Sequence, residues 1–168
     1  MRTYKLVLWI FILYIIQNVF YPVLSLCGYV PELLMCFVVS YASLERRFRK
    51  VSPVIIICAI LSGVGTGRVF SIAVLFIGLA GVAAYLAMSY MQFIPKIIRV
   101  GAVTAFFAFL MHCAEFFAVS ETLTSDFITN TAVWYTLYTT IVVCVIYLIL
   151  GKIMNIDDKT MLIISERN

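Results

Sequence analysis

The chain has 168 residues, of which 64% are hydrophobic and only 12% are charged, and its mean hydropathy is +1.10. A soluble domain carries about 25% charged residues, so this composition excludes a soluble protein and predicts an integral membrane protein. The net charge of +4 does not indicate nucleic-acid binding, because the basic residues are scattered among short polar gaps and do not form one surface.

Six apolar segments follow one another along the chain, and each is a candidate transmembrane helix. We interpret the first as a retained anchor, because it is long and lacks the small-x-small cleavage site of a signal peptide. The third is short for a full crossing, so a re-entrant loop is the alternative there. The segments span approximately residues 4–26, 31–44, 51–63, 69–92, 97–119 and 127–151.

The basic residues decide between the two topologies. With six crossings, eleven of the twelve Lys and Arg residues fall on one side, whereas a re-entrant third segment leaves seven against five. Because basic residues near a membrane stay preferentially in the cytoplasm, the sequence predicts six crossings with both termini cytoplasmic. The expected fold is all-α, with a six-helix transmembrane bundle over residues 1–154 and a short cytoplasmic tail, 155–168. A third span that is buried by protein or crosses a locally thinned bilayer is part of this prediction.

Small residues predict where the helices pack most closely. Gly78, Gly81 and Ala84 recur every third residue on the fourth segment, and Ala102 and Ala105 repeat this spacing on the fifth. Small side chains on one face of a membrane helix allow close backbone approach. We expect ordinary packing within the bundle at these positions, with a dedicated oligomer interface as the alternative.

A few charged residues near the outer side of the bilayer are candidates for a functional site, because such groups are costly in a membrane. Glu32 follows Pro31 at the start of the second segment, Arg68 begins the fourth, and Glu115 lies about one turn before the fifth ends. His112 precedes Glu115 by three residues, which places both on one helical face. We expect Arg68 to pair with Glu32 or Glu115. A structural role for these residues is favoured over a ligand-binding or proton-transfer role.

The sequence shows no catalytic pattern. It contains no H-E-x-x-H, no G-x-S-x-G, no phosphate-binding glycine motif and no pair of intramembrane aspartates, so we expect no enzyme and no cofactor. The odd number of cysteines, mostly within apolar segments and without C-x-x-C spacing, argues against a disulfide framework or a metal site. A scaffold, a partner-binding subunit or a small-ligand receptor remains.

Two short motifs resemble the bacterial rod shape-determining protein MreD family. They are Gly28-Tyr29-Val30-Pro31-Glu32-Leu33-Leu34 and, about 30 residues later, Leu61-Ser62-Gly63-Val64-Gly65-Thr66-Gly67-Arg68-Val69-Phe70, followed by a glycine-bearing helix. The resemblance covers roughly residues 20–90, and length and span count fit as well. Glu32 stands where the family usually has Asp, and Ser62 and Gly63 stand where it has an acidic residue.

The resemblance implies a non-enzymatic scaffold subunit of the cell-elongation machinery in a bacterial inner membrane. Its expected partner is an MreC-like bitopic membrane protein, bound through transmembrane helices, and indirectly MreB-like filaments and peptidoglycan synthases. The alternative is the substrate-binding component of an energy-coupling-factor vitamin transporter, a similar six-helix fold. Those components usually carry a small-xxx-small pattern on the first helix, whereas residues 6–20 here contain no Gly, Ala or Ser.

Overall fold

The structure is a computed structural model that describes residues 3–19, 30–45, 47–65, 70–91, 93–120 and 131–165. These residues form helices and their connections and contain no strand, which confirms the predicted all-α fold. The helices are α1 (Thr3–Val19), α3 (Leu33–Leu44), α4 (Phe48–Gly65), α5 (Phe70–Tyr90), α6 (Lys96–Ser120) and α8 (Val133–Ser165).

Three of the helices are long and apolar enough to cross a membrane by length and composition. These stretches are Phe70–Tyr90, Lys96–Ala118 and Val133–Met154. Helix α8 continues to Ser165, so most of the segment predicted as a tail is helical.

The short helix lies at a different position from the predicted one. The segment predicted over 51–63 is the 18-residue helix α4, which begins three residues earlier and ends two residues later. The short element is α3, with 12 residues and a length of about 18 Å at 1.5 Å per residue.

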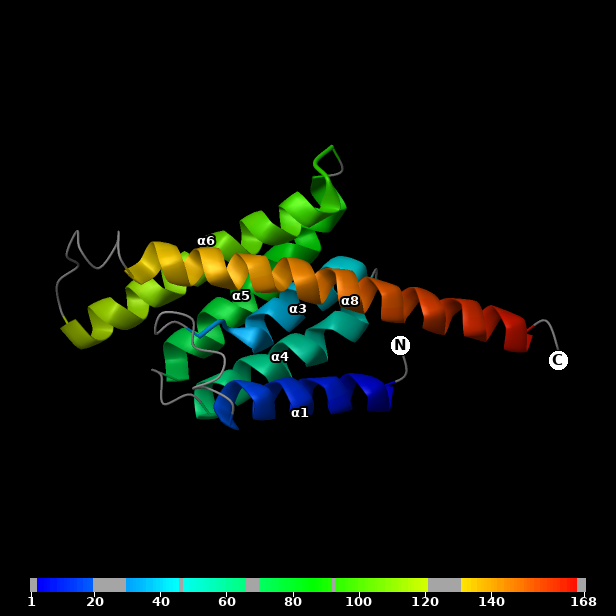
Figure 1. The fold of residues 1–168 in the computed structure, drawn as a ribbon, viewed down its shortest axis with the longest axis horizontal. Helices are drawn as coiled ribbons and strands as arrows, with labels where there is room; N and C mark the ends of the chain where they lie inside the picture. The colour runs from blue at the N-terminus through cyan, green and yellow to red at the C-terminus, as the bar shows by residue number, and fades with distance from the viewer. Residues whose placement is uncertain are drawn as a thin grey trace.

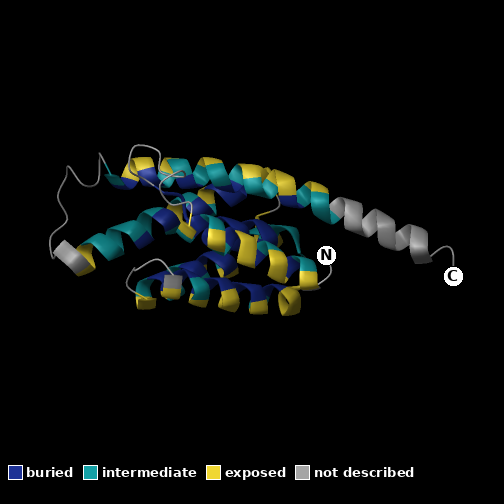
Figure 2. Cartoon of the chain, turned by 60° about the horizontal axis from the view of Figure 1, so that its bottom comes forward, coloured by how far each residue is buried: buried dark blue, intermediate teal, exposed yellow. Residues whose placement is uncertain are grey.

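Helix α3 is the centre of the bundle. It contacts each of the other five described helices, whereas α1 contacts only α3 and α4. Every residue from Leu33 to Ala42 is buried. Figure 1 shows α3 among its neighbours, and Figure 2 shows exposed residues on the outward faces of the bundle. This short helix is therefore covered by the other helices along most of its length.

Two side chains of α3 bond directly to the backbone of α8. The Cys36 thiol donates to the Thr139 carbonyl at 3.5 Å, and one turn later the Ser40 hydroxyl donates to the Val143 carbonyl at 3.5 Å. Because both partners advance by four residues, α3 and α8 run parallel. Hydrogen bonds of this kind hold helices together where lipid removes the hydrophobic driving force between them.

Successive helices run in alternating directions. Phe48 at the start of α4 contacts Tyr85 near the end of α5, with ring centroids 5.1 Å apart. Arg99 near the start of α6 bonds the backbone of the last turn of α5. The start of α1 and the end of α8 lie toward the same end of the bundle (Figure 1). We call this end, which carries Lys50, Lys96 and Arg99, the basic end.

The close-packed face of α5 includes only some of the small residues singled out in the sequence. A Cβ atom on Gly81 would lie 2.6 Å from Val38 Cγ1, and Ala84 is 1% exposed, so both positions require small residues. A Cβ atom on Gly78 would meet nothing within 4 Å. The packing face of α5 is therefore rotated away from Gly78, and its buried residues are Ala73, Ile77, Ala80, Gly81 and Ala84.

On α6, the two predicted packing residues differ in their surroundings. Ala102 is exposed, whereas Ala105 is half-buried and lines an apolar groove of about 520 Å³ between α6 and α8. Gly101 of α6 faces α8, but a Cβ atom there would lie 3.6 Å from Thr140 Cγ2, an ordinary van der Waals contact, so this position does not require a glycine.

Candidate functional site

A buried carboxyl group lies where α1, α3 and α4 meet, at the end opposite the basic end. Glu32 occupies the N-cap position of α3, and its carbonyl accepts the first backbone hydrogen bond of the helix, from Cys36 N at 3.0 Å. Its side chain makes no cap hydrogen bond to its own helix. The carboxyl group is thus available to the neighbouring helices, and Glu32 is 0% exposed.

Two side chains from other helices bond the same oxygen of this carboxyl group. Gln17 Nε2 on α1 donates to Glu32 Oε1 at 2.7 Å, and Ser62 Oγ on α4 donates to it at 2.8 Å. Gln17 Oε1 in turn accepts from the backbone N–H of Leu34 at 3.2 Å. Gln17, Glu32 and Ser62 are all buried, and we call them the carboxyl cluster.

The carboxyl cluster stabilises a particular arrangement of three helices. A buried polar group without partners costs free energy, and here each donor comes from a different helix. A shift of α1 or α4 relative to α3 therefore breaks a hydrogen bond inside the protein. The cluster contains a carboxyl group, an amide and a hydroxyl, a set of groups better suited to fixing the helices relative to one another than to catalysis.

His112 and Glu115 form a second polar group, on α6. His112 Nδ1 lies 3.9 Å from Glu115 Oε2, which agrees with their spacing on one helical face. The imidazole stacks on Tyr135 of α8, with ring centroids 4.4 Å apart and planes 18° apart. This pair therefore contributes to the contact between α6 and α8.

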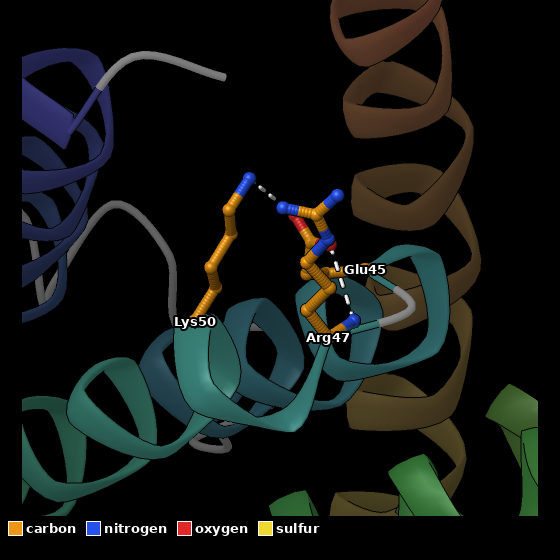
Figure 3. A network of polar contacts seen from close by, with 3 residues as sticks. All are labelled: Glu45, Arg47 and Lys50. Atoms are coloured by element: carbon orange, nitrogen blue, oxygen red, sulfur yellow. Dashed lines mark hydrogen bonds and ion pairs between the residues drawn. The ribbon is translucent and has the colours of Figure 1, made fainter.

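The connection between α3 and α4 at the basic end contains a small charged network (Figure 3). Glu45 Oε1 accepts from the backbone N–H of Arg47 at 3.2 Å, and Glu45 Oε2 lies 3.8 Å from Lys50 Nζ. Both contacts fix the turn that reverses the chain. An ion pair of this kind, with an exposed lysine and a separation of 3.8 Å, contributes little stability by itself.

The sequence-predicted site residues are thus distributed over separate parts of the bundle. Glu32 belongs to the carboxyl cluster, and His112 and Glu115 belong to the contact between α6 and α8. Arg68 lies outside the described residues, so its predicted pairing stays a prediction. Sequence reasoning missed Gln17, although Gln17 and Asn18 are the only amide side chains in the first apolar segment.

No disulfide bond involves Cys36, Cys58, Cys113 or Cys144. Among the described residues, no group of three or more His, Cys, Asp or Glu side chains is arranged to hold a metal ion.

Comparison with known proteins gives no match: no family model fits the chain, and no curated protein and no solved structure is significantly similar to it.

Proposed function

We propose that this protein is a non-enzymatic scaffold subunit of the bacterial cell-elongation machinery, similar to MreD. In this proposal it crosses the cell membrane six times, with both termini in the cytoplasm. It binds an MreC-like bitopic membrane protein through its helices, and through that partner it communicates with MreB-like filaments and the peptidoglycan synthases.

The arrangement of the helices supports the six crossings. Hydrogen bonds join the end of α1 to the start of α3, and the end of α5 to the start of α6, as expected for a chain that reverses at each step. The basic end carries the 47–50 turn and Lys96, in agreement with the positive-inside tendency. The basic end therefore faces the cytoplasm in this proposal.

The strongest support for the MreD-like assignment is the carboxyl cluster. It joins the two motifs on which the resemblance rests, because Glu32 comes from the first and Ser62 from the second. These are also the positions at which the chain departs from the family pattern. An acidic residue in place of Ser62 would face the Glu32 carboxyl group, whereas a serine donates a hydrogen bond to it. The serine at position 62 is therefore compatible with a buried carboxyl group at position 32.

A partner must be engaged through the lipid-facing sides of the helices or through short connections. Large apolar side chains are exposed near the middle of several helices, including Phe11 on α1, Leu79 on α5 and Ile141 on α8. A partner with a single transmembrane helix covers the lipid-facing side of only one or two of these helices. Substitutions at the three residues can therefore show which helix the partner contacts.

The test is co-expression with a candidate MreC-like protein, followed by extraction in mild detergent and co-purification. We expect a stable complex, and we expect Arg at one of these three positions to abolish it. A charged side chain at this depth costs about 2.5–3.5 kcal/mol, and it also disrupts helix packing. The two other Arg variants act as controls for insertion and folding.

Two outcomes would contradict the proposal. One is a well-folded protein that never associates with the MreC-like partner. The other is purified protein that binds a vitamin with nanomolar affinity, which would assign it to the energy-coupling-factor transporters. Loss of the protein from rod-shaped cells should round or swell them without abolishing vitamin uptake.

A further inference from the structure

A polar cleft of about 470 Å³ opens at the basic end, between the end of α3, the end of α5 and the start of α6. Its size falls within the range of about 300–1,000 Å³ that is typical of small-molecule sites. Polar side chains from all three helices line it: Ser43, Glu45, Ser89, Lys96 and Arg99. The carboxyl cluster lies at the opposite end, so the cleft is a separate feature.

Arg99 gives the cleft a buried positive charge. The residue is 6% exposed, and its Nη1 donates to the carbonyl oxygens of Ala87 at 3.2 Å and Met88 at 3.3 Å. These bonds hold the guanidinium against the last turn of α5, where the helix dipole favours a cation. Arg99 Nε is also buried, and it has no hydrogen-bond partner among the described residues. An unsatisfied N–H on a buried cation is costly, and an anionic acceptor removes this cost.

The charges around the cleft favour an anion. Lys96 adds a second cation on the wall. Glu45 is the acidic residue on the wall, and its carboxyl group is engaged by Lys50 Nζ and the Arg47 backbone N–H (Figure 3). The cations of Lys96 and Arg99 are therefore not offset by Glu45. The hydroxyls of Ser43 and Ser89 donate to carbonyls of their own helices. Lys96 and Arg99 are therefore the residues that would bind an anion in the cleft.

We propose that this cleft binds the phosphate group of an anionic phospholipid headgroup. Two membrane helices end and a third begins at the cleft, which places it at the level of the headgroups. Basic pockets between transmembrane helices on the cytoplasmic side are suited to such headgroups. The assignment to the cytoplasmic leaflet depends on the topology proposed above, whereas it does not depend on the MreC-like partner.

The experiment measures lipid binding to the purified full-length chain by native mass spectrometry. Delipidated protein is titrated with phosphatidylglycerol and, separately, with zwitterionic phosphatidylcholine. The variants are Lys96→Gln and Arg99→Gln, and the matched control is Lys152→Gln, an exposed basic residue on α8 that does not line the cleft. Lys96 is exposed, so its substitution leaves the packing between α5 and α6 intact if Arg99→Gln fails to fold.

We expect the wild type to prefer phosphatidylglycerol. Lys96→Gln and Arg99→Gln should each weaken its binding about tenfold, since each removes a charge-assisted hydrogen bond, and Lys152→Gln should change it less than twofold. Equal weakening in Lys96→Gln and Lys152→Gln, or equal binding of the two lipids, overturns the proposal. Displacement of bound lipid by millimolar inorganic phosphate would contradict the proposal that the ligand is a lipid, and would indicate a soluble phosphorylated ligand instead. Failure to bind an MreC-like protein would not affect any of these measurements.

Discussion

Two glycines of α5, three residues apart, give a direct test of the helix packing, because Gly81 lies on the packed face of the helix and Gly78 does not. A methyl group added at Gly81 would lie 2.6 Å from Val38 Cγ1 and 2.7 Å from Ile55 Cγ1, and both neighbours are buried. Real Cβ atoms do not approach other carbon atoms this closely. Since Val38 is branched at Cβ and has little freedom to rotate, α5 must move away from α3 and α4 in Gly81→Ala. The same substitution at Gly78 meets nothing within 4 Å.

The expected magnitudes follow from these two environments. One extra methyl group in a packed core costs about 1–3 kcal/mol. Replacement of a helical glycine by alanine returns up to about 1 kcal/mol in either variant. Gly81→Ala should therefore lower the free energy of unfolding by up to about 2.5 kcal/mol, and Gly78→Ala should raise it by about 0.5–1 kcal/mol.

The assay is denaturant unfolding in detergent micelles, followed by circular dichroism. The difference between the two variants isolates the packing cost, because the change in backbone entropy is common to both. Val38→Ala removes the nearest methyl group, so the penalty of Gly81→Ala should shrink in that background. Equal shifts for the two glycine variants would show that α5 does not pack against α3 through Gly81.

Three further predictions concern the polar contacts and the topology. Ser62→Ala removes a donor to the carboxyl cluster and should lower the free energy of unfolding by about 1–3 kcal/mol. Ser43→Ala, whose hydroxyl donates within its own helix, should change it by less than about 0.5 kcal/mol, and equal losses in denaturant titrations would contradict a role for the cluster. Ser40→Ala removes a hydrogen bond between α3 and α8. It should lower the free energy of unfolding by about 0.6 kcal/mol, and by at most about 1.7 kcal/mol. A loss no larger than that of Ser43→Ala would argue against this interhelical bond. In a cysteine-free background, an impermeant reagent applied to whole cells should label a cysteine at position 123 and spare one at position 48; the reverse pattern sinks the proposed topology.

The positions of the helices could be predicted from the sequence, but their places in the bundle could not. An unbroken apolar run bounded by polar residues is sufficient to locate a membrane-type helix, so α5 begins and ends within two residues of the 69–92 segment. The apolar pattern does not indicate which helix lies at the centre of the bundle. Lipid and protein interior are equally apolar, so a buried helix such as α3 has no polar face that distinguishes it from one in lipid.

The candidate site was predictable only in part, for a related reason. Glu32 was recognisable because a carboxyl group next to an apolar segment is rare and costly. Its partners were not, because Gln17 and Ser62 are uncharged and lie 15 and 30 residues away, so only the fold brings them to Glu32. For Arg99 the sequence indicates only a contribution to the charge topology, since a positive charge near a helix start gives no indication that its side chain turns back onto α5.

The enclosed position of α3 has a consequence for biogenesis. At about 18 Å this helix is shorter than the hydrocarbon core of about 30 Å, yet it is synthesised before four of the five helices that cover it. The nascent chain must hold α3 beside α1 while α4, α5 and α6 emerge. Its Cys36 and Ser40 find their acceptors only when α8, the last of the described helices, has been synthesised. The buried contacts of α3 are therefore completed only with α8, and a chain truncated before Val133 should be recognised by membrane quality-control proteases as unfinished.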